Sequence, residues 1–210
     1  MDTVKTLFMV VAAFGLASIP FAWLVGRWLL GKDVRDYGDG NPGAFNVFKA
    51  GGHKSGYLAV ALDVGKGVPF VFLAHLAGLS GPSLVTIGVA AILGHAYSPL
   101  LGWRGGKAVA VTFGVLLAIP EHELLLAFIA CTVLGFLFIE EDAWTVVFGA
   151  AGALAYTALT RGSTWETALM ICILVIMTVK QFGALHSFPG FRGRLIRWLQ
   201  TIVHATFTII

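Results

Sequence analysis

A glycine-rich stretch near the start of the chain has the residue types of an anion-binding loop. It begins at Asp33 and reads DVRDYGDGNPGAFNVFKAGGHKSG. Glycines let backbone N–H groups turn toward one point, where an anion satisfies them. A lone glycine cluster is more often a simple turn, but this stretch also carries amide and cationic side chains. The residues that we expect around an anion here are Gly38, Asp39, Gly40, Asn41, Gly43, Asn46 and Lys49.

A second basic stretch repeats this pattern further along the chain. It reads HAYSPLLGWRGGK from His95, and Gly105 and Gly106 stand between Arg104 and Lys107. The two glycines allow both cations to converge on one oxyanion, with backbone donors between them. Anchoring at a membrane surface explains the cations but not the glycine pair. His95 is either a proton carrier or hydrogen-bond donor, or a packing residue, which is the commoner role of a lone histidine.

Asp63 and Lys66 are ionisable residues within an otherwise apolar segment. Three positions apart on a helix, they share one face and can form an ion pair. Ionisable groups inside a membrane span are costly and usually functional. They are either a structural pair that joins two helices or part of the anion site. The sequence has no metal-ligand spacing and no Walker-type loop, so we expect neither a metal nor another cofactor.

The elements that position these residues are apolar helices. The chain of 210 residues is 58% hydrophobic and only 12% charged, far from the usage of soluble domains. We expect an all-α integral membrane protein of about seven spans, with a membrane domain over residues 1–190 and a basic amphipathic tail over 191–210. The expected spans are residues 6–30, 57–79, 83–101, 108–119, 123–139, 143–159 and 165–182. The fourth run is short for a full crossing.

Basic residues gather on one side of these expected spans. Alternating sides places ten lysines and arginines on one side and two, Lys5 and Arg161, on the other. Because cytoplasmic loops carry the basic excess, we expect the N-terminus outside, the C-terminus in the cytoplasm and both glycine-rich loops on the cytoplasmic side. The ten are Lys32, Arg35, Lys49, Lys54, Arg104, Lys107, Lys180, Arg192, Arg194 and Arg197.

Three segments together resemble the bacterial acyl-phosphate glycerol-3-phosphate acyltransferases. They are GDGNPGAFN from Gly38, the D-x-x-K-G pattern from Asp63, and GHAYSPLLGWRGGKA from Gly94. Members of that family are seven-helix enzymes of the bacterial inner membrane. They transfer an acyl chain from acyl phosphate to the sn-1 hydroxyl of glycerol 3-phosphate in phospholipid synthesis. The resemblance implies a lipid membrane and these two phosphorylated substrates as partners, and no nucleic acid.

The resemblance also implies roles for individual residues. The first loop would hold one phosphate, Arg104 and Lys107 would bind the second, and His95 matches the family's G-H motif. Phosphate is a good leaving group once its charge is neutralised and the hydroxyl is placed against the acyl carbonyl. The expected catalytic residues are His95, Lys107 and Asn46. The expected substrate-binding residues are Gly38, Asp39, Gly40, Asn41, Gly43, Lys49, Asp63, Lys66, Arg104, Gly105 and Gly106.

Several positions depart from the family pattern. Asp39 stands where the family typically has serine, Phe45 where it has threonine, and Ala108 where it has glycine. Acids fill residues 140–142, where a serine-rich motif is expected, and the C-terminal motif is not recognisable. Because an anion in a phosphate site repels phosphate, two alternatives to the standard enzyme stay open: a catalytically altered family member, or a transporter of a phosphorylated solute.

Overall fold

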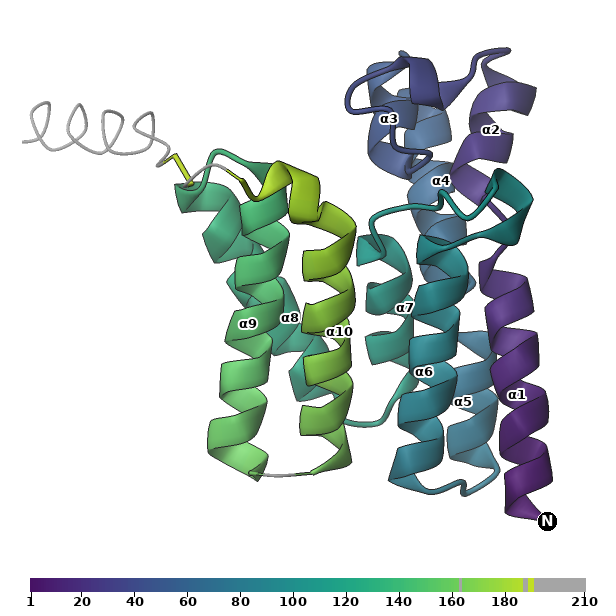
Figure 1. The fold of residues 1–210 in the computed structure, drawn as a ribbon, viewed down its shortest axis with the longest axis vertical. Coiled ribbons are helices and arrows are strands. Elements are labelled where there is room, and N and C mark those ends of the chain that lie inside the picture. The colour runs from purple at the N-terminus through teal and green to yellow at the C-terminus, as the bar shows by residue number, and fades with distance from the viewer. Residues whose placement is uncertain (163, 187–188, 191–210) are drawn as a thin grey trace, which may run out of the picture.

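The computed structural model describes residues 1–162, 164–186 and 189–190, and their regular elements are helices. The expected tail over residues 191–210 lies outside this described part. Figure 1 shows the N-terminus at one end of the molecule and the described C-terminal residues at the other. The helices are α1 Asp2–Ala17, α2 Phe21–Leu29, α3 Ala44–Lys49, α4 His53–Gly65, α5 Pro69–Leu76, α6 Gly81–Ala96, α7 Val109–Ala118, α8 His122–Phe138, α9 Asp142–Arg161 and α10 Trp165–Gln181, with short 3-10 turns η1 Val34–Asp36, η2 Pro99–Leu101 and η3 Phe182–Ala184.

Five helical segments of the described chain are long and apolar enough to cross a membrane, and α7 and α8 are shorter apolar helices. Each apolar run expected from the sequence therefore corresponds to helix, and the fourth run is the short helix α7. The expected total of seven crossings, and their direction, stay predictions. The five long segments are Asp2–Leu29, His53–Leu76, Gly81–Leu101, Asp142–Arg161 and Trp165–Ala184.

Two of the expected continuous helices are interrupted. The first run breaks between α1 and α2, where Pro20 precedes α2, and the second breaks between α4 and α5, where Pro69 is the first residue of α5. Proline interrupts the helical hydrogen bonding, so carbonyl groups beside the break lie outside the regular helical pattern. Within a membrane such groups need a partner from the protein. The carbonyl oxygen of Ser18 accepts from Ser98 Oγ at 2.5 Å, and that of Ile19 accepts from Lys66 Nζ at 2.7 Å.

Small residues allow the helices of this region to approach closely. A Cβ on Gly67 would lie 2.4 Å from the carbonyl oxygen of Val111, and one on Gly114 would lie 2.0 Å from that of Val64. Helices α4 and α7 therefore pack backbone against backbone, which is how helices commonly associate in membranes. This contact holds the middle of α7 beside the C-terminal end of α4.

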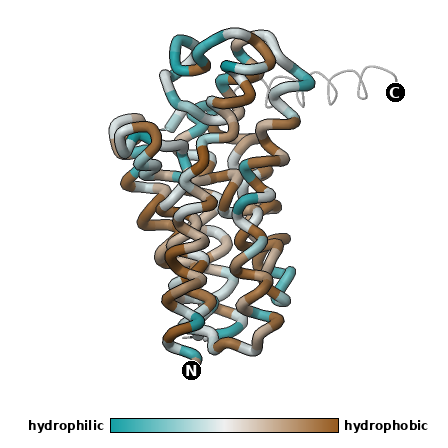
Figure 2. Tube along the Cα trace, turned by 90° about the vertical axis from the view of Figure 1, so that its right-hand side faces the viewer, coloured by the Kyte–Doolittle hydropathy of each residue, from teal (hydrophilic) through white to brown (hydrophobic). Residues whose placement is uncertain are grey.

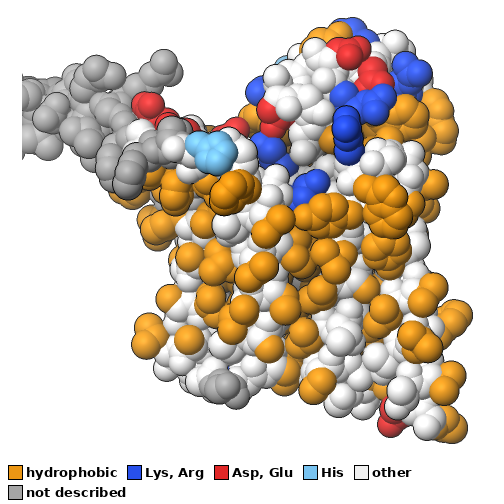
Figure 3. All heavy atoms as spheres, viewed as in Figure 1, with side chains coloured by type: hydrophobic (Ala, Val, Ile, Leu, Met, Phe, Trp, Pro, Cys, Tyr) orange, Lys and Arg blue, Asp and Glu red, His pale blue; other side chains and the backbone are white. Residues whose placement is uncertain are grey.

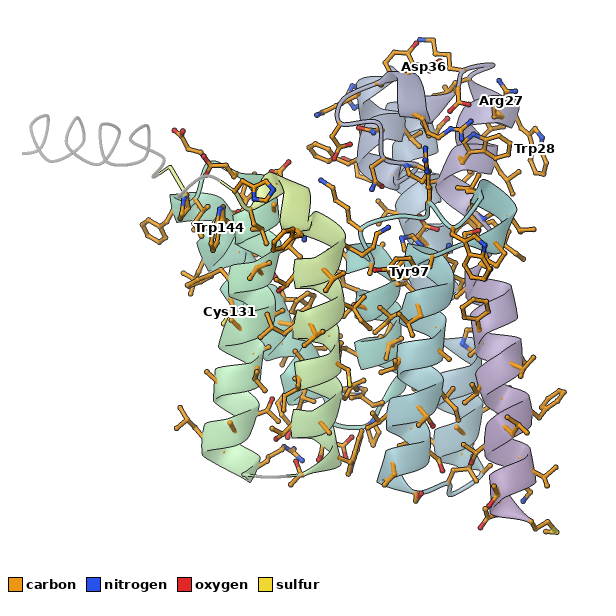
Figure 4. All side chains as sticks on the ribbon, in the orientation of Figure 1. Arg27, Trp28, Asp36, Tyr97, Cys131 and Trp144 are labelled. Atoms are coloured by element: carbon orange, nitrogen blue, oxygen red, sulfur yellow. The ribbon has the colours of Figure 1, made fainter. Side chains whose placement is uncertain are left out.

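The helices form two neighbouring groups, α1–α7 and α8–α10 (Figure 1). Figure 2 shows a mainly hydrophobic body with hydrophilic residues concentrated at the end opposite the N-terminus. The exposed side chains of Val4, Leu7, Phe8 and Val11 on α1 are apolar, as lipid contact requires. Arg27 and Trp28 mark the opposite end (Figure 4), the pairing of cation and indole that is typical of a membrane surface.

Candidate active site

The first glycine-rich loop folds over the N-terminal end of α3. Gly38 and Gly40 have φ angles of 61° and 74°, a region that glycine adopts without the strain of a Cβ. Gly38 also needs to lack a side chain, because a Cβ there would lie 2.2 Å from Asn46 Oδ1. Asn46, buried on α3, donates to the carbonyl oxygen of Asn41 at 2.7 Å and to Asp39 Oδ1 at 2.9 Å. Asn46 therefore ties this loop together, and its expected role at a phosphate stays a prediction.

An ion pair between Asp39 and Lys107 joins the two basic loops. Lys107 Nζ lies 2.5 Å from Asp39 Oδ2, with both side chains partly exposed. The backbone N–H of Asn41 also donates to Asp39 Oδ1 at 3.2 Å. Partial burial alone would raise the pKa of Asp39, but the hydrogen bond and charge of Lys107, with the donors from Asn41 and Asn46, hold that pKa below its ordinary value. Asp39 is therefore a carboxylate at neutral pH.

The glycine pair of the third loop packs against His95. A Cβ on Gly105 would lie 2.0 Å from the carbonyl oxygen of His95, and one on Gly106 would lie 2.1 Å from its Nε2. The N–H of Gly106 donates to that same carbonyl at 3.0 Å. The expectation that both glycines form a donor nest for an oxyanion is therefore wrong for Gly106. The pair instead lets the loop cross directly over the imidazole.

Lys180 of α10 contacts the end of α6 next to this loop. Its Nζ donates to the carbonyl oxygen of Ala96 at 2.8 Å and lies 4.7 Å from the centre of the Tyr97 ring. Figure 4 places Tyr97 at the loop end of α6. A cation at the last carbonyls of a helix is favourable. Lys180 thus joins α10 to the turn that carries His95.

Asp63, Lys66 and His95 form a buried polar cluster beneath the two loops. Lys66 Nζ lies 2.8 Å from Asp63 Oδ1, so the predicted pairing is confirmed, and His95 Nδ1 lies 3.8 Å from the same oxygen. All three side chains are less than 10% exposed. They border a cavity of about 10 Å³, also lined by Ser18 and Ser98, which has room for about one water molecule.

A larger groove of about 500 Å³ connects this polar cluster to the lipid-facing surface. Its wall is mainly apolar, and some lining residues, including Phe45, Val133 and Phe136, are themselves exposed on the outside of the helices. Its polar end contains Asp39, Asn41, Gly43, Asn46, Asp63, His95 and Lys107. The groove therefore accommodates a molecule that is apolar along its length and polar at one end.

The remaining predicted site residues lie outside this groove. Lys66 turns toward the small cavity and the Ile19 carbonyl, which favours the structural alternative for this lysine. Lys49 is exposed and its Nζ lies 4.9 Å from the centre of the Phe45 ring. Arg104 is exposed on the third loop and is not part of the groove wall. The expected convergence of Arg104 and Lys107 on one anion stays a prediction.

Sequence reasoning missed the polar residues that α8–α10 contribute to the groove. Thr132, Asp142, Thr145 and Gln181 line it from the side opposite α4 and α7. Among the described residues, the Thr145 hydroxyl and both polar atoms of the Gln181 side chain are buried without a hydrogen-bond partner. Buried polar atoms of this kind call for a ligand or water. The available signal was a glutamine at the end of an apolar run.

The acidic run after α8 does not fill the cationic end of the groove. Glu141 accepts a hydrogen bond from the N–H of Gly190 at 2.8 Å, and the N–H of Glu140 donates to the carbonyl oxygen of Gly190 at 2.9 Å. Asp142 alone of these three lines the groove. The acid that reaches Lys107 is Asp39.

The fold and this groove define an integral membrane protein with a site for a molecule that is apolar at one end and anionic at the other. The sequence model of the glycerol-3-phosphate acyltransferase family matches residues 7–186, and the chain belongs to this family of enzymes. The resemblance seen in the sequence motifs is therefore confirmed.

Individual relatives agree with this assignment. The glycerol-3-phosphate acyltransferase of Laribacter hongkongensis is 33% identical over 90% of this chain and 96% of that protein. The one from Anaeromyxobacter is 43% identical over 59% of this chain, and the match spans 63% of its length, less than two thirds. A crystal structure of the integral membrane enzyme PlsY (YgiH), in its glycerol 3-phosphate form, matches with a TM-score of 0.78 and 28% identity, covering 86% of this chain and 90% of that one.

Proposed function

We propose that this protein transfers an acyl chain from acyl phosphate to the sn-1 hydroxyl of glycerol 3-phosphate, releasing lysophosphatidic acid and inorganic phosphate. The observation that carries this proposal is the groove itself, whose apolar wall ends at Lys107, Asn46 and His95. An acyl phosphate has the same division into a hydrocarbon tail and an anionic head. A solved relative described in its glycerol 3-phosphate form supports this acceptor.

The groove suits acyl transfer without a covalent enzyme intermediate. The acceptor oxygen attacks the acyl carbonyl, the carbon–oxygen bond to phosphate breaks, and the hydroxyl proton leaves with the phosphate. Lys107 neutralises charge on the departing phosphate, which lowers the barrier electrostatically. Asn46 orders the loop over the reacting groups, and His95 offers a hydrogen-bonding ring at the same end. Binding both reactants in one place supplies much of the remaining rate enhancement.

We place the groove's polar end at the cytoplasmic face of a bacterial inner membrane. Figure 3 shows lysine and arginine side chains gathered at the end of the molecule opposite the N-terminus, above a mainly hydrophobic body. Both glycine-rich loops lie at that end, and cytoplasmic faces carry the basic excess. Soluble glycerol 3-phosphate would enter from this side, while the acyl tail would enter from the lipid.

The proposed reaction is tested with protein reconstituted in nanodiscs and supplied with both substrates. We expect stoichiometric release of inorganic phosphate and lysophosphatidic acid, and a loss of at least about 100-fold for Lys107→Ala, in line with removal of one charge-stabilising group. Lys54→Ala is the matched control, because Lys54 is exposed on α4 and does not line the groove. Activity of Lys107→Ala equal to that of the control would refute the assignment.

Membership in an acyltransferase family favours the enzyme over the transporter of a phosphorylated solute. At the first of the interrupted spans, which would also suit a transport site, the carbonyl oxygens of Ser18 and Ile19 already accept from Ser98 and Lys66. An altered donor or acceptor is tested in the same assay by replacing acyl phosphate or glycerol 3-phosphate with analogues one at a time.

A further inference from the structure

Asp39 holds the groups that a phosphate in the groove would need. One carboxylate oxygen contacts Lys107 Nζ at 2.5 Å, and the other accepts from Asn46 Nδ2 at 2.9 Å and from the N–H of Asn41 at 3.2 Å. A cation and two amide donors, converging from two loops, make a typical set of ligands for an oxyanion. All four residues line the same groove.

The position of Asp39 allows it to leave this arrangement. Its side chain is 44% exposed and lies between Gly38 and Gly40, whose backbones adopt positive φ angles. An exposed ion pair contributes little to stability. A phosphate dianion carries twice the charge of the carboxylate and attracts Lys107 more strongly. Asp39 can therefore be replaced by a substrate phosphate, at a cost in affinity.

We propose that Asp39 is a specificity-determining residue that competes with the substrate's phosphate for Lys107 and the Asn46 amide. This inference rests on the proposed function and adds a selection rule to it. Singly charged head groups gain too little from Lys107 to displace Asp39, whereas phosphate dianions displace it. After acyl transfer the carboxylate returns to Lys107, which promotes release of inorganic phosphate and keeps product inhibition weak.

The test measures binding of inorganic phosphate by calorimetry, and its inhibition constant in the acyl-transfer assay, for the wild-type protein, Asp39→Asn and Asp39→Ser. Both variants remove the competing charge, and the asparagine preserves the size of the side chain. We expect phosphate to bind on the order of tenfold more tightly to both, since a like charge at a few ångströms repels the phosphate. Product inhibition should strengthen by a similar factor.

Asp36→Asn is the matched control, because Asp36 is an exposed acid of the same loop region that lies outside the groove. Its phosphate affinity should change less than twofold. Unchanged or weaker phosphate binding by both Asp39 variants would overturn the inference, even if the wild-type enzyme is fully active. Tighter binding by these variants, in a protein that transfers no acyl chain, would instead overturn the proposed function and leave the competition in place.

Discussion

The group α1–α7 contains two interrupted spans and a buried ion pair, whereas α8–α10 are uninterrupted helices of 17, 20 and 17 residues. In the first group, Lys66 bonds Asp63 and the Ile19 carbonyl in the interior. In the second, Arg161 pairs with Glu123 and Glu166 at the helix ends near the N-terminal side of the molecule (Figure 1). Where the backbone is irregular inside a membrane, its polar groups need specific partners, so few residue types are acceptable there. Regular helices satisfy their own backbone groups and accept many more residue types.

This difference explains where the recognisable motifs lie. The first group positions Asp39, His95 and Lys107 through specific hydrogen bonds and glycine contacts, so its sequence has few alternatives. The second group supplies one wall of the groove, where many side chains of suitable size are acceptable. If the proposed reaction holds, we expect α1–α7 to stabilise charge and α8–α10 to position the substrate.

The largest expected effect is a loss of stability when an ion pair is broken in the first helix group rather than in the second. Lys66→Met leaves Asp63 buried and unpaired, and removing one partner of a buried pair typically costs about 3–5 kcal/mol. Glu123→Gln, which removes only the half-exposed partner of Arg161, should lower the unfolding temperature much less. Thermal unfolding in the same detergent measures both. Equal losses would show that the two groups do not differ in this respect.

The double variant Asp63→Leu/Lys66→Met is the control for the loss of stability in Lys66→Met. Replacing both charges by apolar side chains removes the unpaired carboxylate, so the double variant should be more stable than Lys66→Met alone. It still lacks the donor to the Ile19 carbonyl and should stay below the wild-type protein. A double variant less stable than the single one would contradict the assigned role.

A smaller effect is expected on the other side of the groove. Gln181→Leu preserves approximate size but removes the buried amide, and we expect acyl transfer to fall about tenfold, through KM more than kcat, as for a positioning contact. Thr145→Val provides a matched loss of a hydroxyl. The kcat and KM of these variants are measured by steady-state kinetics and compared with those of Lys107→Ala. If Gln181→Leu lowers kcat as much as Lys107→Ala does, both helix groups carry the chemistry.

The smallest predicted effect concerns the residue that precedes α7. Ala108 is fully buried with a φ of 68°, a conformation that costs a residue with a Cβ roughly 1–2 kcal/mol. Glycine removes this strain, but its greater freedom in the unfolded chain costs about 0.5–1 kcal/mol on folding. Ala108→Gly should therefore stabilise the protein by up to about 1 kcal/mol, measured by thermal unfolding. A clear loss of stability would show that the methyl packing outweighs the strain.

The sequence alone predicted the parts of this protein that depend on local spacing. Asp63 and Lys66 pair because a spacing of three residues on a helix brings them to one face. The family pattern also marked Ala108, whose left-handed backbone explains why glycine is usual there.

Features that depend on contacts between distant segments were not predictable in this way. The Asp39–Lys107 pair joins two loops, and the N–H of Gly106 bonds His95 because the loop folds back over α6. The break in the first span involves distant partners, Ser98 and Lys66, which donate to the carbonyl oxygens of Ser18 and Ile19. Groove-lining residues such as Val133 and Ala110 are of the same types as residues at ordinary lipid-facing or core positions, so the sequence does not distinguish them.

The opening of the groove between exposed apolar side chains has a practical consequence for work on the purified protein. A detergent with a single tail and a polar head has nearly the same shape as a lysophospholipid. In micelles it is present at millimolar concentrations and competes for the same space as the acyl donor. Apparent affinity for the donor will therefore depend on the length of the detergent tail, and nanodiscs of two-tailed lipid will report the intrinsic value.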